Sequence, residues 1–251
     1  NCNHNINVTR KSLIIFLQMN NNLVVQFFVS VDKYDDPTYN QIGVNEELYK
    51  YSTISVEQYA KRIGADYKLM TEPVINWIHP TFERFDLFFN DTWWEQYDNI
   101  LYLDTDVIVW PTAPNVFEQY PSTTTFKPVF DRIARKNTVK YHEERAKGTC
   151  LEKFAPEVLR QNRFNAGVFM LNKHCVDAMK TFLDYKQIKG DDNEQLIYAM
   201  LESQVEIDQM DWRYNKKNGT QCYFGHAAGR QKFRPNYDML KIAKDTFDAS
   251  I

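Results

Sequence analysis

Residues Asn99–Trp110, NILYLDTDVIVW, place the acidic triplet Asp104-Thr105-Asp106 inside an apolar run. A run of this length, rich in β-branched and aromatic residues, predicts a strand buried on both faces. Residues i and i+2 of an extended chain point the same way, so both carboxylates are expected on one side, about 7 Å apart along the backbone. Two like charges in apolar surroundings call for a cation, and hard oxygen ligands suit Mg²⁺ or Mn²⁺ carrying a phosphate-bearing substrate. The alternative, a D-x-D on a surface turn, is disfavoured by the apolar flanks.

Composition limits the class of protein. The 251 residues are enough for one large α/β domain or two intimate halves, and 43% hydrophobic and 15% aromatic content excludes global disorder. A net charge of −3 gives no electrostatic reason to expect nucleic acid or an anionic membrane as a partner. The four cysteines form no C-x-x-C pair, which disfavours a zinc site. The longest apolar stretch near the start, Leu13–Leu17, is too short to span a bilayer, so we expect no integral membrane segment.

The first half of the chain reads as a βαβ unit. Leu23–Val31 is a strong strand run, the S-x-x-Q of Ser55 predicts a helix start with Gly64 at its end, and Tyr67–Met70 is a second strand. This order predicts a parallel sheet whose ligands bind at the carboxyl ends of the strands. Neither G-x-G-x-x-G nor G-x-x-x-x-G-K-[ST] occurs, so a phosphate would be held by metal and basic side chains.

The other segments complete the expected organisation. Residues 1–22 are read as a leader of uncertain order, with one short strand at Leu13–Leu17. A helix capped by Thr81 should bury Phe82, Phe85 and Phe89, with Arg84 off that stripe. The basic run Arg132–Arg145 reads as a solvated face, or else as a mobile lid or acceptor-binding segment. Phe164–Leu171 is a strand entered through small residues, where a ligand could approach the backbone, and Gly190–Gln195 should start a further helix.

Gly225–Lys232, GHAAGRQK, is a second informative stretch. Its H-x-x-G-x-x-K spacing suits a diphosphate clamp. The imidazole of His226 can complete a metal shell, Gly229 lets backbone approach phosphate, and Lys232 supplies a mobile positive charge. A lone histidine is more often structural, but its pairing with the D-x-D favours ligation.

At this point the chain resembles a GT-A-fold glycosyltransferase, most closely the family 8 group that includes glycogenin and bacterial galactosyl- and glucosyltransferases. The resemblance is carried by YLDTDVIV, FNAGVFMLNK, the loop near GDDNEQL, and HAAGRQK, and it spans Leu23 to Lys232. It implies an α/β single domain of GT-A type over residues 23–251, with a Rossmann-like, mostly parallel central sheet flanked by helices. Residues 23–110 would form the nucleotide-binding half, and residues 111–251 the donor-sugar and acceptor half.

The resemblance also implies roles for individual residues. Asp104, Asp106 and His226 would bind the metal, with Asp104 and Thr105 also meeting the nucleotide. The remaining nucleotide-, diphosphate- and donor-sugar-binding positions would be Val29, Ser30, Asp32, Tyr34, Arg84, Asn165, Ala166, Gly167, Gly229 and Lys232. In the donor-sugar loop Asp191, Asp192, Glu194 and Gln195 compete for the catalytic roles.

The resulting functional hypothesis is transfer of a hexosyl group, of glucose or galactose type, from a UDP-sugar to a hydroxyl group of a glycan, protein or small-molecule acceptor. The resemblance points to retention, and an inverting enzyme would need Asp191, Asp192 or Glu194 as base. An imidazole beside two carboxylates favours Mn²⁺ over Ca²⁺, with Mg²⁺ as the other choice. A sugar-nucleotide nucleotidyltransferase and a Ca²⁺-containing sugar-binding module are the competing classes. We expect a soluble domain, with the cytoplasm slightly favoured as its compartment.

Overall fold

The computed structural model describes residues 21–30, 33, 46–75, 77, 79–131, 137–183, 190–217, 221–227 and 237–248. The strand expected at Leu13–Leu17 lies outside these residues, as does nearly all of the expected leader. Asn22, the last residue assigned to that leader, already belongs to the first strand.

The described elements follow one another in this order: β1 (Asn22–Phe27), α1 (Glu46–Ile63), β2 (Asp66–Met70), η2 (Pro80–Phe85), α2 (Asp86–Phe89), α3 (Thr92–Gln96), β3 (Asn99–Leu103), β4 (Val107–Val109), α4 (Val116–Gln119), β5 (Lys127–Phe130), α5 (Val139–Ala146), η4 (Cys150–Lys153), α6 (Pro156–Asn162), β6 (Phe164–Asn172), α7 (Lys173–Met179), η5 (Lys180–Phe182), α8 (Asp192–Ser203), η6 (Trp212–Asn215), β7 (Lys216–Lys217), β8 (Phe224–His226) and α9 (Tyr237–Phe247).

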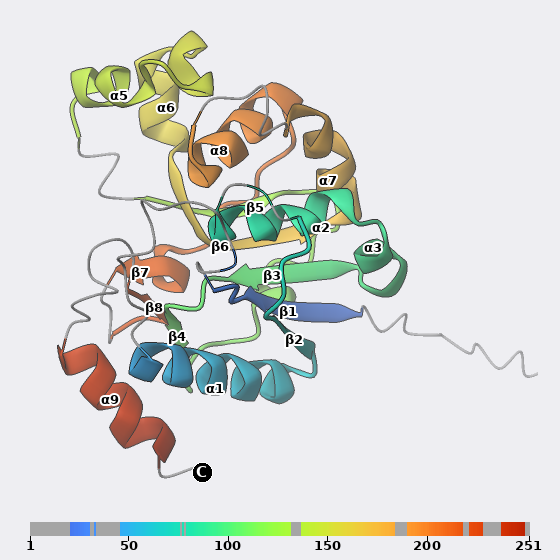
Figure 1. Cartoon of the computed structure of the whole chain (residues 1–251), viewed down its shortest axis with the longest axis vertical. Helices are drawn as coiled ribbons and strands as arrows, with labels where there is room; N and C mark the ends of the chain where they lie inside the picture. Colours follow the sequence, from blue (N-terminus) through green and yellow to red (C-terminus); the bar gives the residue numbers. More distant parts are fainter. Residues whose placement is uncertain are drawn as a thin grey trace, which may run out of the picture.

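A five-stranded sheet in the order β2-β1-β3-β6-β5 forms the centre of the molecule. Strands β1, β2 and β3 are parallel, β6 runs antiparallel to β3, and β5 runs antiparallel to β6. Four of the five strands therefore share one direction, which confirms the mostly parallel α/β sheet expected from the sequence. A smaller sheet, β4-β8-β7, lies beyond the carboxyl end of β3 (Figure 1).

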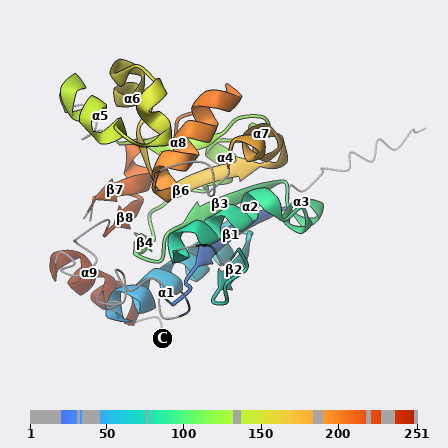
Figure 2. The ribbon, with the colours of Figure 1, turned by 45° about the horizontal axis from the view of Figure 1, so that its top comes forward.

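Helices cover both faces of the large sheet, with α1 on one side and α2, α7 and α8 on the other (Figures 1 and 2). Side chains alternate between the faces, as the period of a strand requires. Val24 and Leu101 pack with Val56 of α1, whereas Leu23 and Ile100 belong to the core cluster on the opposite face. Burial on both faces explains why these strands read as continuous apolar runs.

Helix α1 begins at Glu46, so the predicted start at Ser55 is wrong. Ser55 is buried inside the helix, where its hydroxyl donates to Ser52 O and accepts from Val109 N. Ser55 thus accepts a hydrogen bond from the backbone of β4 and does not cap its own helix. The S-x-x-Q pattern cannot predict such a contact, because its partner is distant in the sequence. Gly64 does end the helix, with φ +69° in the left-handed region that glycine tolerates.

The prediction of one continuous strand from Asn99 to Trp110 is also wrong. β3 ends at Leu103 and β4 starts at Val107 in the other sheet, and Val107 N donates to Asp104 O across the turn at 3.1 Å. A turn keeps both carboxylates partly exposed, whereas a sheet interior would leave them desolvated.

Several other expectations can be scored against the described residues. β6 and the start of α8 are confirmed, while β1 ends at Phe27, short of the expected Val31. The expected helix at Thr81 forms as η2 and α2, and His79 caps it. Phe82 and Phe85 are buried as expected, but Phe89 is 42% exposed because it lies at the end of α2.

The described part of the chain contains no helix both long and apolar enough to cross a bilayer. The three cysteines that the structure describes, Cys150, Cys175 and Cys222, form no disulfide with one another.

Candidate metal-binding and catalytic site

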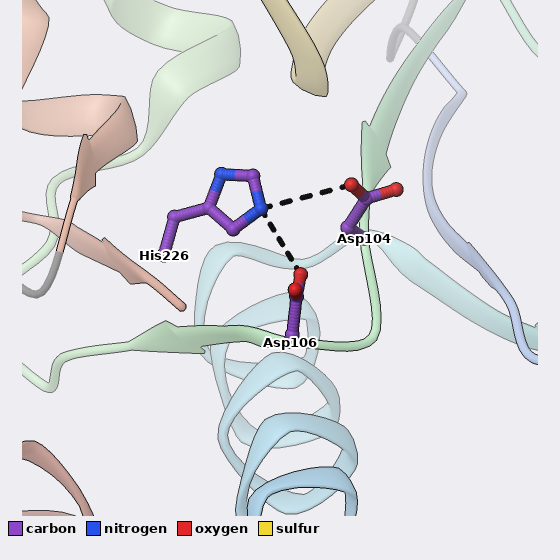
Figure 3. A group of neighbouring side chains, drawn as sticks. All are labelled: Asp104, Asp106 and His226. Atoms are coloured by element: carbon purple, nitrogen blue, oxygen red, sulfur yellow. Dashed lines mark ion pairs between the residues drawn. The ribbon is translucent and has the colours of Figure 1, made fainter. Parts of the chain in front are cut away.

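Two strands of the small sheet bring the acidic triplet and the distant histidine together. β4 pairs with β8 so that Val107 lies opposite His226, and Ala227 N donates to Asp106 O at 2.9 Å. Asp104, Asp106 and His226 each offer one ligand atom, and these atoms all lie within 4.8 Å of one another (Figure 3). The convergence expected from the sequence is therefore present.

The distances between the ligand atoms fit one divalent ion. His226 Nε2 lies 3.0 Å from Asp106 Oδ1 and 3.7 Å from Asp104 Oδ2. Neighbouring ligands of an ion with bonds of about 2.1 Å are separated by about 3 Å in octahedral geometry. The imidazole is 2% exposed, while the side chains of Asp104 and Asp106 are 25% and 15% exposed, so the group is open on the carboxylate side. Two oxygens and one nitrogen are a donor set suited to Mn²⁺.

The two oxygens of Asp104 have different partners. Oδ1 accepts from the Tyr102 hydroxyl and lies 3.0 Å from Arg84 Nη2, whereas Oδ2 faces His226. The backbone is held as well, because Asp104 N donates to Gly167 O at 2.8 Å and Gln26 Nε2 donates to Asp104 O at 3.1 Å. One oxygen is thus anchored by the fold, which aims the other at the imidazole.

Arg84 connects the carboxylate turn to the start of α8. Its Nη2 lies 3.0 Å from Asp104 and 3.2 Å from Asp192, and its Nη1 donates to Ala166 O. The guanidinium carbon also lies 4.7 Å from the centre of the Tyr102 ring. Burial by itself lowers the pKa of Arg84, but the facing carboxylates outweigh this and raise the pKa above its usual value. The buried guanidinium is therefore a permanent positive charge beside the site.

Asp192 is a buried carboxyl close to the site. Burial raises its pKa to about 6, and the opposing attraction of Arg84 is too weak to cancel this effect. A carboxyl with such a pKa changes charge close to neutral pH.

The first residues of β6 fit tightly against the metal group. A Cβ on Gly167 would lie 2.2 Å from His226 Cε1 and 2.7 Å from Asp104 Oδ2. Only glycine lets these two side chains approach at this point. The groups that approach the backbone here are the site's own side chains, and the expected approach of a ligand stays a prediction. Asn165 Oδ1 accepts from Gly167 N, and Ala166 N donates to Asn193 Oδ1 of α8.

The donor-sugar loop candidates lie at the amino end of α8. Asp191 accepts from Glu194 N and Glu194 accepts from Asp191 N, which is a reciprocal capping box. Gln195 is buried and donates to Gly190 O. Asp192 reaches the metal group through Arg84. The assignment of catalytic roles among these residues stays a prediction.

The remaining expected positions divide into two groups. Val29 and Ser30 follow β1 and are buried and half-buried, and Thr105 is half-buried in the turn between the aspartates. Outside the described residues lie Asp32, Tyr34, Gly229 and Lys232. The roles of both groups stay predictions.

Sequence reasoning missed three polar groups that touch the site. Tyr102 and Gln26 interrupt apolar strand runs, and a polar residue at a buried strand position was a signal that could have identified them. Asn215 contacts His226 through Nδ1 at 2.7 Å. No local pattern marks it, because its contact depends on the pairing of β7 with β8.

Comparison with solved structures bears on the fold. A glycosyltransferase involved in glycosylation of the major capsid of PBCV-1 is similar to this chain with a TM-score of 0.54 and 10% identity, over 90% of this chain and 99% of that chain. The chain has the GT-A fold. At 10% identity the likeness establishes the fold alone.

Two further structures are similar at lower scores. The galactosyltransferase LgtC in complex with donor and acceptor sugar analogues has a TM-score of 0.49 and 12% identity, over 90% of this chain and 96% of that chain. The glycosyltransferase GlyE of Streptococcus pneumoniae has a TM-score of 0.47 and 14% identity, over 90% of this chain and 60% of that chain. Neither score is high enough to carry an argument. No protein-family model and no curated protein matches the chain.

Proposed function

We propose that this protein is a metal-dependent glycosyltransferase that moves a hexosyl group from a UDP-sugar to a hydroxyl acceptor. The observation that carries the proposal is the convergence of Asp104, Asp106 and His226 on one point at the carboxyl end of β3. In an open α/β sheet this end of the strands is where ligands bind.

The donor set favours Mn²⁺, with Mg²⁺ as the second choice. An ion bound there supplies positive charge to the diphosphate of the departing UDP. The protein holds the three ligands in place: Arg84 and Tyr102 fix one oxygen of Asp104, while the pairing of β4 with β8 fixes His226 opposite the turn. Such preorganised groups stabilise developing negative charge without reorganising during the reaction.

The donor occupies both halves of the fold in this proposal. The nucleotide lies over the loop that follows β1, near Val29 and Ser30, and the sugar lies beside Asn165–Gly167. Both segments adjoin the metal group in support of this placement: Gly167 O accepts from Asp104 N, and Gln26 of β1, the strand that leads to Val29, donates to Asp104 O. The permanently charged Arg84 donates to Ala166 O, the backbone of the segment proposed to hold the sugar.

We favour retention at the anomeric carbon, with the leaving phosphate accepting the acceptor proton. Inversion needs a carboxylate base that is available to the acceptor. Asp191 and Glu194 are occupied in a capping box, and Asp192 is paired with Arg84. Their engagement supports the retaining route.

A panel of nucleotide sugars tests the proposal. UDP-glucose, UDP-galactose, GDP-mannose and UDP alone are each added with Mn²⁺, Mg²⁺, Ca²⁺ or EDTA, and thermal stability and UDP release are measured. We expect stabilisation and slow UDP release with a UDP-hexose and Mn²⁺, and neither with EDTA. Release of pyrophosphate from UTP and a sugar phosphate would instead identify a nucleotidyltransferase. Equal support of UDP binding by Ca²⁺ would contradict the role of His226. Proton NMR of the product anomer separates retention from inversion.

A further inference from the structure

Asn215 contacts the buried histidine on the side that faces away from the carboxylates. Its Oδ1 lies 2.7 Å from His226 Nδ1, and its Nδ2 donates to the backbone oxygen of Asn165 at 3.2 Å. The amide of Asn215 therefore connects the proposed imidazole ligand to Asn165, the second residue of β6.

The two contacts together fix which ring nitrogen carries the proton. A backbone carbonyl only accepts, so the amide nitrogen of Asn215 must face Asn165 O. Its oxygen then faces His226 Nδ1, which must be the N–H of the ring. In the neutral imidazole the lone pair consequently lies on Nε2, the atom directed at Asp104 and Asp106.

The fold holds Asn215 in this position by backbone pairing. It is the last residue of η6 and directly precedes β7, whose Lys216 and Lys217 pair with Gly225 and His226 of β8. Asn215 thus directly precedes the strand that pairs with the strand of His226, which limits how far the amide can shift from the imidazole.

We propose that Asn215 is a positioning residue of the metal site: it fixes the Nδ1–H tautomer and the ring plane of His226, so that Nε2 is presented to the ion. This inference rests on the proposed metal site and not on the identity of the sugar. Outer partners of ligating histidines contribute about 10- to 100-fold to metal affinity in proteins.

Three variants test the role. Asn215→Leu keeps the branching at Cγ and removes both hydrogen bonds, whereas Asn215→Asp keeps an acceptor for Nδ1–H and loses only the bond to Asn165. Asn115→Leu is the matched control, because Asn115 is also half-buried, accepts from Phe117 N and donates to Glu118, neither of which belongs to the metal group.

The first readout is Mn²⁺ affinity of the full chain without nucleotide, by electron paramagnetic resonance. We expect Asn215→Leu to bind Mn²⁺ about 10- to 100-fold more weakly than the wild type, with Asn215→Asp and Asn115→Leu close to wild type. Equal affinity for Asn215→Leu and Asn115→Leu would overturn the proposal, as would an Asn215→Asp defect as large as that of Asn215→Leu.

The second readout does not require metal. Nitrogen-15 NMR of the histidine rings reports which nitrogen of neutral His226 is protonated, with His226→Gln used to assign its signals. We expect Nδ1–H in the wild type and in Asn215→Asp, and a shift toward Nε2–H in Asn215→Leu. An unchanged tautomer in a folded Asn215→Leu variant would refute the inference. Failure of the wild type to bind Mn²⁺ would end the proposed function, while this second measurement would still decide the role of Asn215.

Discussion

Two regions of the molecule gather carboxylates, and Arg84 touches both. The turn between β3 and β4 presents Asp104 and Asp106, with side chains 25% and 15% exposed, to the imidazole of His226. At the amino end of α8, Asp191 and Glu194 cap each other, and Asp192 is buried against Arg84. The number of acidic residues is similar, but only the turn leaves oxygens directed at one shared point. The hydrogen-bonding partners and the exposure of the carboxylates, more than their number, therefore distinguish the candidate metal site from the start of α8.

The largest expected effect is at the turn. Asp106→Ala removes one of the three proposed metal ligands, and we expect UDP release with Mn²⁺ to fall by roughly 10³-fold, or about 4 kcal/mol in transition-state stabilisation. Steady-state kinetics at several Mn²⁺ concentrations measure the loss. Asp245→Ala, an exposed aspartate on α9, is the control and should behave as wild type. Full Mn²⁺-dependent activity in Asp106→Ala would remove the basis of the comparison.

The buried carboxyl of Asp192 at the start of α8 should make the stability of the protein depend on pH. Asp192 has a pKa of about 6 in the folded chain, against roughly 3.9 when unfolded. The folded state thus binds this proton more tightly than the unfolded state. The contribution of Asp192 to the free energy of unfolding is therefore most favourable below about pH 4, and up to roughly 3 kcal/mol of it is lost as the pH rises through about 6.

Asp192→Asn removes that titration. We measure its free energy of unfolding by denaturant at a series of pH values. The difference between the variant and the wild type should shift in favour of the variant as pH rises from about 4 to 7, because only the wild type loses stability through this titration. Two curves that stay parallel over this range would show that folding does not raise the pKa of Asp192, and the contrast between the two acidic regions would weaken.

A smaller effect is expected where β6 passes the turn. Gly167→Ala places a methyl group 2.2 Å from His226 Cε1, so the imidazole or the strand must shift, and Mn²⁺ affinity should fall roughly 10- to 100-fold. Isothermal titration measures the affinity. Gly64→Ala is the uncrowded control: it has φ +69° and no atom within 4 Å, so it should lose about 1 kcal/mol of stability through backbone strain while keeping Mn²⁺ affinity. Equal Mn²⁺ affinity in both variants would contradict the tight fit.

The smallest expected effect belongs to the capping box. Asp191→Ala should cost about 1 kcal/mol of unfolding free energy, because Glu194 N loses its acceptor, and should leave Mn²⁺ affinity unchanged. Thermal unfolding and Mn²⁺ titration of the same preparation check both parts. If sugar transfer fell far more than stability does, Asp191 would contribute to binding of the donor sugar as well as to the helix cap.

Local sequence patterns predicted much of the scaffold. Apolar runs gave β1 and β6, since strands buried on both faces need continuous hydrophobic residues, and Gly64 marked a helix end because only a residue that tolerates positive φ fits there. Local patterns gave wrong predictions where a side chain contacts a segment that is distant in the sequence. Ser55 bonds to β4, and the aspartates lie in a turn between two sheets.

The sequence by itself determined which chemistry was available: two carboxylates two residues apart, one imidazole far along the chain, and a glycine between them that leaves room for contact. The tertiary structure alone decided how these groups are used. Pairing of β4 with β8 sets His226 opposite the turn, Arg84 and Tyr102 select which oxygen of Asp104 remains available, and Asn215 orients the ring. The reason is physical, because hydrogen-bond partners of buried groups come from segments distant in sequence, and only their packing makes them neighbours.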